Sequence, residues 1–135
     1  MDIRRINKEM AWELRHVVMW PDKDVDYVKL QDDDEGIHYG LFSNERVVSV
    51  ISLFVDGDEA QFRKFATLRH EQGKGYGSKL LQYVLDEAQS MGIERIWCNA
   101  RKNKAPFYAK FGLAQTPSIF SKGGIEYVIM EKLMK

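Results

Sequence analysis

The chain has 135 residues, enough for one compact domain and too few for two, so we expect a single domain over residues 1–135. Hydrophobic residues make up 44% and aromatic residues 12%, which indicates a packed core and argues against disorder. Lys and Arg number 20 and Asp and Glu number 20, so the broad positive field of a nucleic-acid-binding protein is missing and no nucleic-acid partner is expected.

The first third of the chain is predicted to contain one strand, one helix and a polar loop. Residues 2–6 fit a short strand. Asn7 is typical of a helix N-cap, and the helical spacing that follows it ends at Trp20-Pro21. Residues 22–36 are polar and acidic, which indicates a loop with a short helix around residues 25–30.

The middle of the chain is predicted to form an antiparallel meander. Strand-like runs occupy residues 37–42, 46–55 and 59–68. Asp56-Gly57 joins the second and third runs and is typical of a β-hairpin turn.

The last part of the chain alternates helices and strands. Apolar residues from Tyr76 to Met91 share one helical face, and Gly92 is a natural stop. The other expected elements are a buried strand at 93–100, a short helix at 104–111, and strands at 113–116 and 124–132. This order predicts an α/β domain with a mixed sheet.

The cysteine content and the lack of long apolar runs indicate the cellular compartment in which the protein works. Cys98 is the single cysteine and cannot form an internal disulfide, and no His and Cys residues have zinc-site spacing, so no metal is expected. The first ten residues contain no signal-peptide core, and no stretch approaches the roughly 18 apolar residues of a membrane span. We therefore expect a cytoplasmic protein without a membrane partner.

The most informative stretch is residues 72–80, QGKGYGSKL, which lies between a strand and an amphipathic helix. Glycines there allow positive φ angles and a close approach of a ligand to the backbone. Free amides at a helix N-terminus attract anions, and Lys74 and Lys79 add positive charge. The turn predicts a phosphate or pyrophosphate site; a glycine-rich helix entry without a ligand is the alternative.

The spacing of these glycines separates the turn from two common nucleotide motifs. The P-loop pattern G-x-x-x-x-G-K-[ST] is missing, and G-x-G-x-G differs from the dinucleotide fingerprint G-x-G-x-x-G. The pattern that fits is Q-x-x-G-x-G, formed by Gln72, Gly75 and Gly77.

In this motif the sequence resembles the GNAT superfamily of N-acetyltransferases, which bind acetyl-CoA through it. A second stretch, Phe107-Tyr108-Ala109-Lys110-Phe111-Gly112-Leu113, resembles the family's F-Y-x-K-x-G-[FL] segment. The resemblance implies an α/β GNAT fold with a mixed, mostly antiparallel sheet of six to seven strands flanked by about four helices. It also implies acetyl-CoA as cosubstrate and no metal.

The same resemblance implies where the coenzyme lies. It occupies the opening between the fourth and fifth strands, where a backbone amide near residues 65–67 polarises the thioester carbonyl. Phe107 is also explained by packing alone. The implied coenzyme contacts are Phe65, Ala66, Thr67, Gln72, Gly73, Lys74, Gly75, Tyr76, Gly77, Ser78, Asn99 and Phe107.

Two residues are candidates for proton transfer. Tyr108 stands where the family carries its frequent general acid; a core tyrosine is the alternative. Some relatives have a glutamate base at the position of Gln61, which cannot serve as one. Glu59, two residues earlier on the same strand face, is the remaining candidate base. There are two alternatives to Glu59 as the base. Glu59 is solvated and water removes the proton of the amine, or the amine arrives without a proton.

Candidate contacts with the acceptor are Trp20, His38 and Arg63. Each also has a purely structural explanation. Trp20 could pack at the end of the helix, and His38 could be a strand residue whose ring nitrogens are hydrogen-bonded within the protein. Arg63 could lie on its strand outside the acceptor pocket. The acidic stretch at 22–36 is either a solvated loop or an entrance that favours a cationic amine.

The expected function is transfer of an acetyl group from acetyl-CoA to a small-molecule or peptide amine, by direct attack in a ternary complex. A non-catalytic acyl-CoA-binding module of the same fold and a nucleotide-binding protein are the alternatives. A homodimer through the terminal strands is compatible with the sequence.

Overall fold

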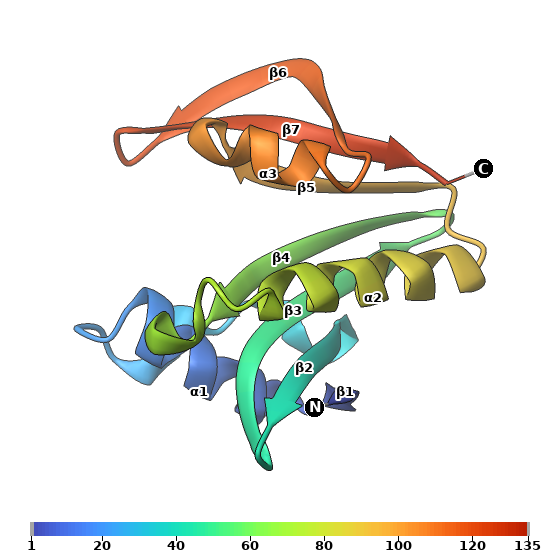
Figure 1. The fold of residues 1–135 in the computed structure, drawn as a ribbon. Helices are drawn as coiled ribbons and strands as arrows, with labels where there is room; N and C mark the ends of the chain where they lie inside the picture. Colours follow the sequence, from blue (N-terminus) through green and yellow to red (C-terminus); the bar gives the residue numbers. More distant parts are fainter. Residues whose placement is uncertain (1, 135) are drawn as a thin grey trace.

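The computed structural model of the chain describes residues 2–134. Its strands and α-helices are β1 (Asp2–Ile6), α1 (Lys8–Met19), β2 (Ile37–Ser43), β3 (Arg46–Asp56), β4 (Glu59–Thr67), α2 (Tyr76–Ser90), β5 (Arg95–Arg101), α3 (Ala105–Ala109), β6 (Ala114–Lys122) and β7 (Ile125–Leu133) (Figure 1). Short 3-10 helices are η1 (Val25–Val28), η2 (Asp33–Glu35), η3 (Arg69–Glu71) and η4 (Lys102–Lys104).

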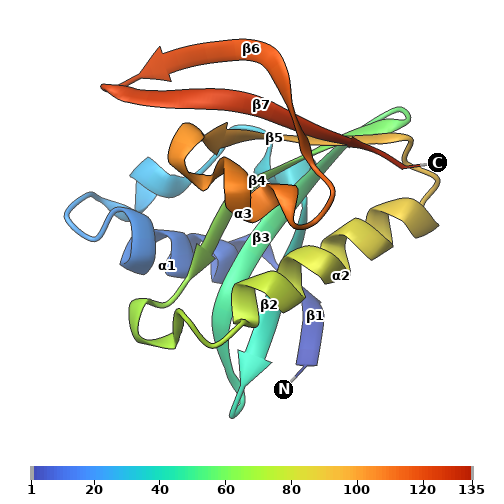
Figure 2. The same ribbon diagram turned by 45° about the horizontal axis from the view of Figure 1, so that its top comes forward.

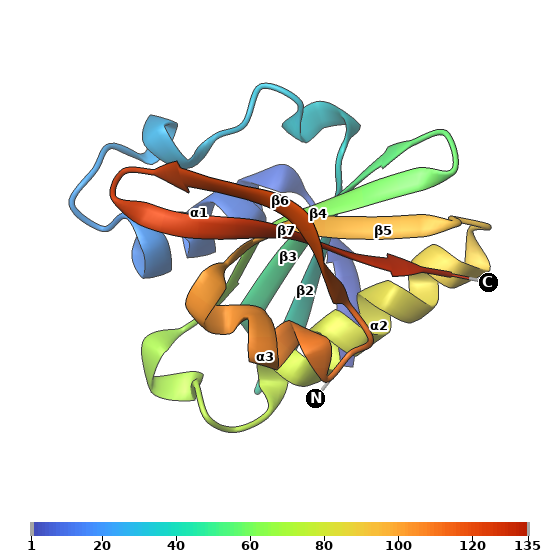
Figure 3. The ribbon, with the colours of Figure 1, turned by 90° about the horizontal axis from the view of Figure 1, so that it is seen from above.

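The strands form one sheet in the order β1-β2-β3-β4-β5-β7-β6. Neighbouring strands are antiparallel, except for β4 and β5, which are parallel. Helix α1 covers one face of the sheet and α2 and α3 cover the other, as Figure 3 shows. The mixed, mostly antiparallel sheet expected from the sequence is confirmed.

The main core lies between the sheet and helix α2. This helix buries one side in full, because its apolar residues recur every three or four positions. The buried residues of α2 are Leu80, Leu81, Val84, Leu85 and Ala88. Between α1 and the other face, Leu14 packs with Val50 and Ala66 in a smaller cluster. No helix among residues 2–134 is long and apolar enough to cross a membrane.

Some boundaries differ from the sequence expectation. Residues 2–134 hold seven strands and three α-helices, where about four helices were expected, because the polar segment after α1 forms only the 3-10 helices η1 and η2. Strand β6 extends to Lys122 instead of ending at Thr116. Its register with β7 shifts between Gln115 and Ile119, around Pro117, and exposure on both faces removed the alternation that would have predicted it.

The position of the site depends on how β4 leaves its neighbours. β4 pairs with β5 only through Glu59–Gln61 and Arg95–Trp97. Beyond these residues the two strands diverge, as Figures 1 and 2 both show, while β4 stays paired with β3 as far as Thr67. The β3–β4 register shifts opposite Lys64, whose φ is 56°, so β4 contains a bulge at this point.

Candidate active site

The glycine turn ends in an uncapped helix N-terminus. Gly73 and Gly75 have φ angles of 81° and 83°, in the left-handed region that glycine tolerates best. Gly75 is the N-cap of α2, and no side chain hydrogen-bonds to the cap. A Cβ built on either glycine meets nothing within 4 Å, so the space beside the turn is open. Free amides at such a helix start can bind an anion, so the phosphate site expected from the sequence stays a prediction that this geometry permits.

Two residues of the motif, Gln72 and Gly77, allow the turn to lie close against β4. Gln72 Nε2 donates to the Thr67 carbonyl oxygen over 3.0 Å, which ties the turn to the end of the strand. A Cβ on Gly77 would stand 3.2 Å from Cζ of Phe65, so glycine lets the first turn of α2 approach β4 closely. These contacts explain the presence of Gln72 and Gly77 at these positions even without a ligand.

Lys74 is engaged within the protein. Its Nζ donates to Glu71 Oε1 over 3.0 Å, and this hydrogen bond raises the pKa of Lys74. Arg46 reaches the other oxygen of Glu71 at 3.3 Å. All three residues, with Ser43, Asn44, Val48 and Tyr76, line a cavity of about 400 Å³ next to the turn.

The open end of β4 presents an unpaired strand edge. Residues 62–67 of β4 have no ladder partner in β5. Their other edge is fixed, because Ser49 of β3 pairs with Thr67 and its hydroxyl lies 2.8 Å from that of Thr67. Ser49 Oγ also donates to the Ala66 carbonyl over 3.2 Å. An extended ligand arm can hydrogen-bond to such an edge by strand addition.

Helix α3 brings its aromatic residues to this end of β4. The ring centroid of Phe107 lies 6.3 Å from that of Phe65, and that of Tyr108 lies 5.8 Å from that of Phe62. Burial raises the pKa of Tyr108, and the neighbouring Cys98 adds to the effect. Tyr108 keeps its proton at neutral pH, as an ordinary tyrosine also does, and the higher pKa makes it a weaker proton donor. Burial also raises the pKa of Cys98 to about 12, so this thiol is not a reactive thiolate at neutral pH.

Glu59 lies at the opposite, paired end of β4. Its carboxylate accepts from Arg95 Nη1 over 3.1 Å, and Arg95 Nε donates to Glu131 over 2.6 Å. Glu59 therefore belongs to an ion-pair cluster where β4, β5 and β7 are joined. Asn99 lies further along β5, is exposed, and pairs in register with Ile129.

A buried polar network beneath α1 was not expected from the sequence. Arg15 has no exposed surface, and its two terminal nitrogens donate to both oxygens of Asp33 over 2.9 and 3.0 Å. Arg15 also donates to Ser52 Oγ over 2.9 Å. Arg15 lies four residues after the buried Ala11, so helical spacing placed it on the buried face, but nothing local identified Asp33 as its partner.

The same network contains His38. Its Nδ1 lies 2.7 Å from Ser52 Oγ and its Nε2 lies 2.9 Å from the Asp33 carbonyl oxygen, so both ring nitrogens have protein partners. Burial alone would raise the pKa of Asp33, but hydrogen bonds from Arg15, the Leu30 amide and Trp12 outweigh it and lower that pKa to about 2. The network fixes the loop after α1 against the sheet.

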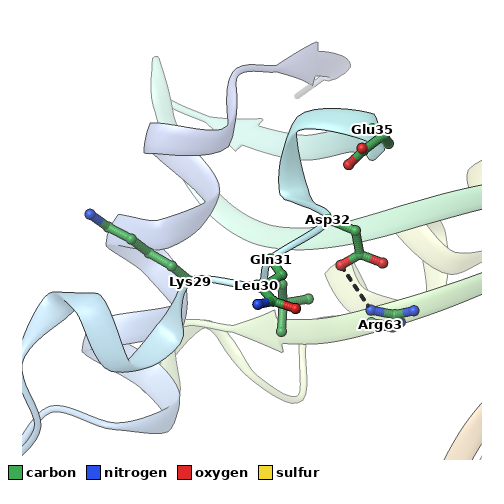
Figure 4. Close-up of a pocket in the computed structure, with 6 residues that line it drawn as sticks. All are labelled: Lys29, Leu30, Gln31, Asp32, Glu35 and Arg63. Atoms are coloured by element: carbon green, nitrogen blue, oxygen red, sulfur yellow. Dashed lines mark hydrogen bonds and ion pairs between the residues drawn. The ribbon is translucent and has the colours of Figure 1, made fainter.

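Arg63 lines a second cavity, next to this loop. The cavity measures about 480 Å³ and is shown in Figure 4, with Lys29, Leu30, Gln31, Asp32, Glu35 and Arg63 around it. Of the three candidate acceptor contacts, only Arg63 is part of its lining. His38 is held in the network, and Trp20 packs edge-on against Tyr27 at 5.1 Å between ring centroids.

The acidic loop has much of its charge neutralised. Asp32 pairs with Arg63 at 3.2 Å, and Asp33 pairs with Arg15. Asp34 pairs with Lys8 of α1. The negative field expected from the composition of residues 22–36 is therefore much reduced. Residues 2–134 contain no group of three His, Cys, Asp or Glu side chains that could hold a metal ion.

Comparison with known proteins identifies the family. Residues 5–113 match the acetyltransferase (GNAT) family. The chain belongs to this family and is an N-acetyltransferase. It is 25% identical over 145 residues to the uncharacterized N-acetyltransferase YitI of Bacillus subtilis (strain 168), covering 100% of this chain and 97% of the relative.

Two solved structures share the fold. The ribosomal-protein-S18-alanine N-acetyltransferase from Escherichia coli has a TM-score of 0.81 at 17% identity, covering 98% of this chain and 93% of that one. An aminoglycoside 6'-N-acetyltransferase complexed with coenzyme A has a TM-score of 0.81 at 15% identity, covering 100% and 98%. The superfamily and fold expected from the sequence are confirmed.

Proposed function

We propose that this protein transfers the acetyl group of acetyl-CoA to an amine by direct attack in a ternary complex. The observation that carries the proposal is the uncapped N-terminus of α2 beside the unpaired edge of β4. The amides of residues 73–78 bind the pyrophosphate, and the pantetheine arm lies along Phe65, Ala66 and Thr67. Gln72, Lys74, Asn99 and Phe107 complete the coenzyme contacts in this proposal.

The chemistry needs three groups. An alkyl ammonium has a pKa near 10, so about one molecule in a thousand is nucleophilic at pH 7, and a base or water must remove its proton. A β4 amide near residues 65–67 polarises the thioester carbonyl. The amine nitrogen then bonds to the acetyl carbon, the carbon–sulfur bond breaks, and Tyr108 donates its proton to the departing sulfur. What supports this role is the position of Tyr108, whose ring lies 5.8 Å from that of Phe62 at the open end of β4.

The acceptor enters on the α1 side in this proposal, through the cavity that Arg63 lines. His38 acts as a positioning residue, because it holds Ser52 and the Asp33 backbone. Trp20 flanks the entrance. Glu59 and water are the two candidate bases.

A homodimer is part of the proposal. Strand β6 is the last strand of the sheet, and its side chains are exposed along almost the whole length, with Ile119 52% and Phe120 37% exposed. An uncovered apolar edge of this kind favours pairing with a second copy. Light scattering of the purified chain measures its oligomeric state directly, and we expect a dimer in the cytoplasm.

The decisive experiment measures free-thiol release from acetyl-CoA with a panel of cationic, neutral and anionic amines. We expect release that depends on both acetyl-CoA and one class of amine. Tight acetyl-CoA binding without release by any amine would instead support the acyl-CoA-binding module. Stabilisation by ATP or NAD but not by coenzyme A would contradict both readings.

A glycine pair tests the pyrophosphate cradle. Gly75 and Gly92 lie at the two ends of α2, with φ angles of 83° and 81°, and a Cβ built on either meets nothing within 4 Å. Valine therefore brings the same backbone strain at both sites, but only Gly75→Val crowds the cradle. Hydrogen bonds to a charged group contribute about 1.5–3 kcal/mol, so coenzyme affinity should fall about tenfold to a hundredfold in Gly75→Val alone. Calorimetric titration with coenzyme A measures this; equal affinities in the two variants would contradict the cradle.

A further inference from the structure

We propose that Arg63 and Lys64 form a subsite for a carboxylate of the acceptor, so that the acceptor is an amine that also carries a carboxylate. This inference rests on the proposed function and names the substrate class of the same site. It comes from the arrangement of cations at the bulge of β4 and from the cavity beside it.

Arg63 is held ready for a ligand by the protein. Its Nε donates to Gln61 over 2.9 Å. Its Nη1 donates to Asp32 over 3.2 Å, the contact that Figure 4 marks with a dashed line. The guanidinium also lies over the ring of Phe54, 4.4 Å from the centroid. Within residues 2–134 the other terminal nitrogen, Nη2, has no hydrogen-bond partner. A guanidinium fixed on three sides, on the wall of a cavity of about 480 Å³, is preorganised to bind a carboxylate.

Lys64 is held in an unusual conformation next to Arg63. Its φ of 56° is uncommon for a residue other than glycine. The register shift that causes it leaves Lys64 and Phe65 opposite the single residue Ile51, and such bulges redirect a side chain away from the regular strand pattern. The bulge therefore changes the direction of the Lys64 side chain. It does so in the part of β4 that is no longer paired with β5.

The ammonium of Lys64 is half-buried, and the described part of the chain gives it no hydrogen bond or ion pair. Burial lowers the pKa of Lys64, and the positive charges of Arg15, Lys122 and Arg63 lower it further against the opposing effect of Asp33. A partly desolvated charge without a counter-ion is unfavourable. An anion brought by the substrate would relieve it.

The local charge balance favours an anion over a second cation. Asp33 pairs with Arg15 and Asp32 pairs with Arg63, so these four charges balance, and among the described residues of the bulge Lys64 is the cation that remains. Lys64 has no carboxylate partner of its own among residues 2–134, and the positive charge of Lys122 lowers its pKa further. Glu35 also lines the cavity and would attract a second ammonium group, which makes a diamine the competing acceptor.

The order of residues along β4 places the two proposed functions next to each other. Arg63 and Lys64 come directly before residues 65–67, whose backbone amides are proposed to polarise the thioester. A carboxylate bound by Arg63 and Lys64 therefore lies on the same segment of β4 as the proposed reaction centre, as an acceptor with an amine and a carboxylate in one small molecule requires.

Matched acceptors test the subsite. Thiol release is measured with each of the twenty amino acids, with its carboxamide, and with a series of diamines. We expect the best amino acid to exceed its carboxamide at least tenfold in kcat/KM. Lys64→Met should reduce this ratio to about one with little change in the carboxamide rate, and Lys64→Arg should keep it. Lys23→Met, which removes the same charge from the exposed loop after α1, should leave the ratio unchanged.

A binding measurement provides a readout that does not need turnover. With the protein saturated with coenzyme A, an N-acetylamino acid should raise the Tm at lower concentration than its carboxamide, and Lys64→Met should abolish the difference. A preference for diamines or carboxamides, or a ratio that Lys64→Met leaves intact, would overturn the carboxylate subsite while the transferase function stands. Failure of acetyl-CoA to bind at all would overturn the proposed function, and the subsite with it.

Discussion

The two faces of the sheet use polar residues in opposite ways. Under α1, Arg15, Asp33 and His38 are buried and bond to partners within the protein, with Nε of Arg15 as the exception among the described residues. On the other face, the N-terminus of α2 has no side-chain cap, and the half-buried Tyr108 packs against the rings of Phe62 and Phe107. Polar groups with internal partners stabilise the fold, whereas groups without them remain available to a substrate.

This contrast predicts that substitutions on the two faces change different properties, stability on one face and catalysis on the other. A change to the buried pair Arg15 and Asp33 under α1 should reduce stability with little effect on the chemistry of the folded protein. A change at the open end of β4 should reduce catalysis with little effect on stability. The predictions below test the contrast in order of expected effect.

Asp33→Asn should have the largest effect, and on stability. The substitution leaves the fully buried guanidinium of Arg15 without its counter-ion, which costs about 3–5 kcal/mol in comparable buried pairs. Urea denaturation followed by circular dichroism measures the loss. Asp34→Asn is the matched control, because its ion pair with Lys8 is exposed and contributes little. Similar unfolding midpoints for the two variants would contradict the structural role of the network.

Tyr108→Phe should leave stability nearly unchanged and impair turnover. Removing the proton donor is expected to lower kcat about a hundredfold, the lower range for general acid catalysis, with the affinity for coenzyme A preserved. Steady-state thiol release and calorimetric titration measure the two quantities. Tyr83→Phe removes the same hydroxyl from an exposed position on α2 and should behave as the unsubstituted protein. Equal kcat in Tyr108→Phe would remove this residue from the mechanism.

The sequence could predict the substrate-facing side better than the internal network. The glycine turn, the amphipathic helix after it and the aromatic pair Phe107-Tyr108 depend on spacing within a few residues, which a linear pattern shows. The pairing of Arg15 with Asp33 joins residues 18 positions apart through tertiary packing. The bulge at Lys64 has no glycine to mark it and follows from the register of β3 against β4. Neither feature could be predicted without the three-dimensional structure.

Acid should weaken the network in a defined range of pH. The pKa of Asp33 is about 2 in the folded protein against an ordinary value of 3.8, so the folded state favours the ionised carboxylate. Its contribution is complete above pH 4 and is lost as the pH falls from about 4 towards 2, for a total of roughly 2 kcal/mol. Urea denaturation between pH 5 and 2 should show this slope in the unsubstituted protein and in Asp34→Asn. The free energy of unfolding should depend less steeply on pH in Asp33→Asn. Parallel pH dependences in all three proteins would mean that other carboxylates cause the acid sensitivity.

Glu59 is the residue on which the contrast is weakest, because it has an internal partner and is also a candidate base. Its carboxylate accepts from Arg95 at the paired end of β4, so we expect Glu59→Gln to change kcat/KM less than about threefold. Glu131→Gln removes the other carboxylate of the same arginine and should have a similarly small effect. If Glu59 were the base, Glu59→Gln alone would lower kcat/KM about a hundredfold or more and abolish the acidic limb of its pH profile. Deprotonation would then depend on a residue fixed within an ion-pair cluster, and internal partners would no longer separate stabilising residues from catalytic ones.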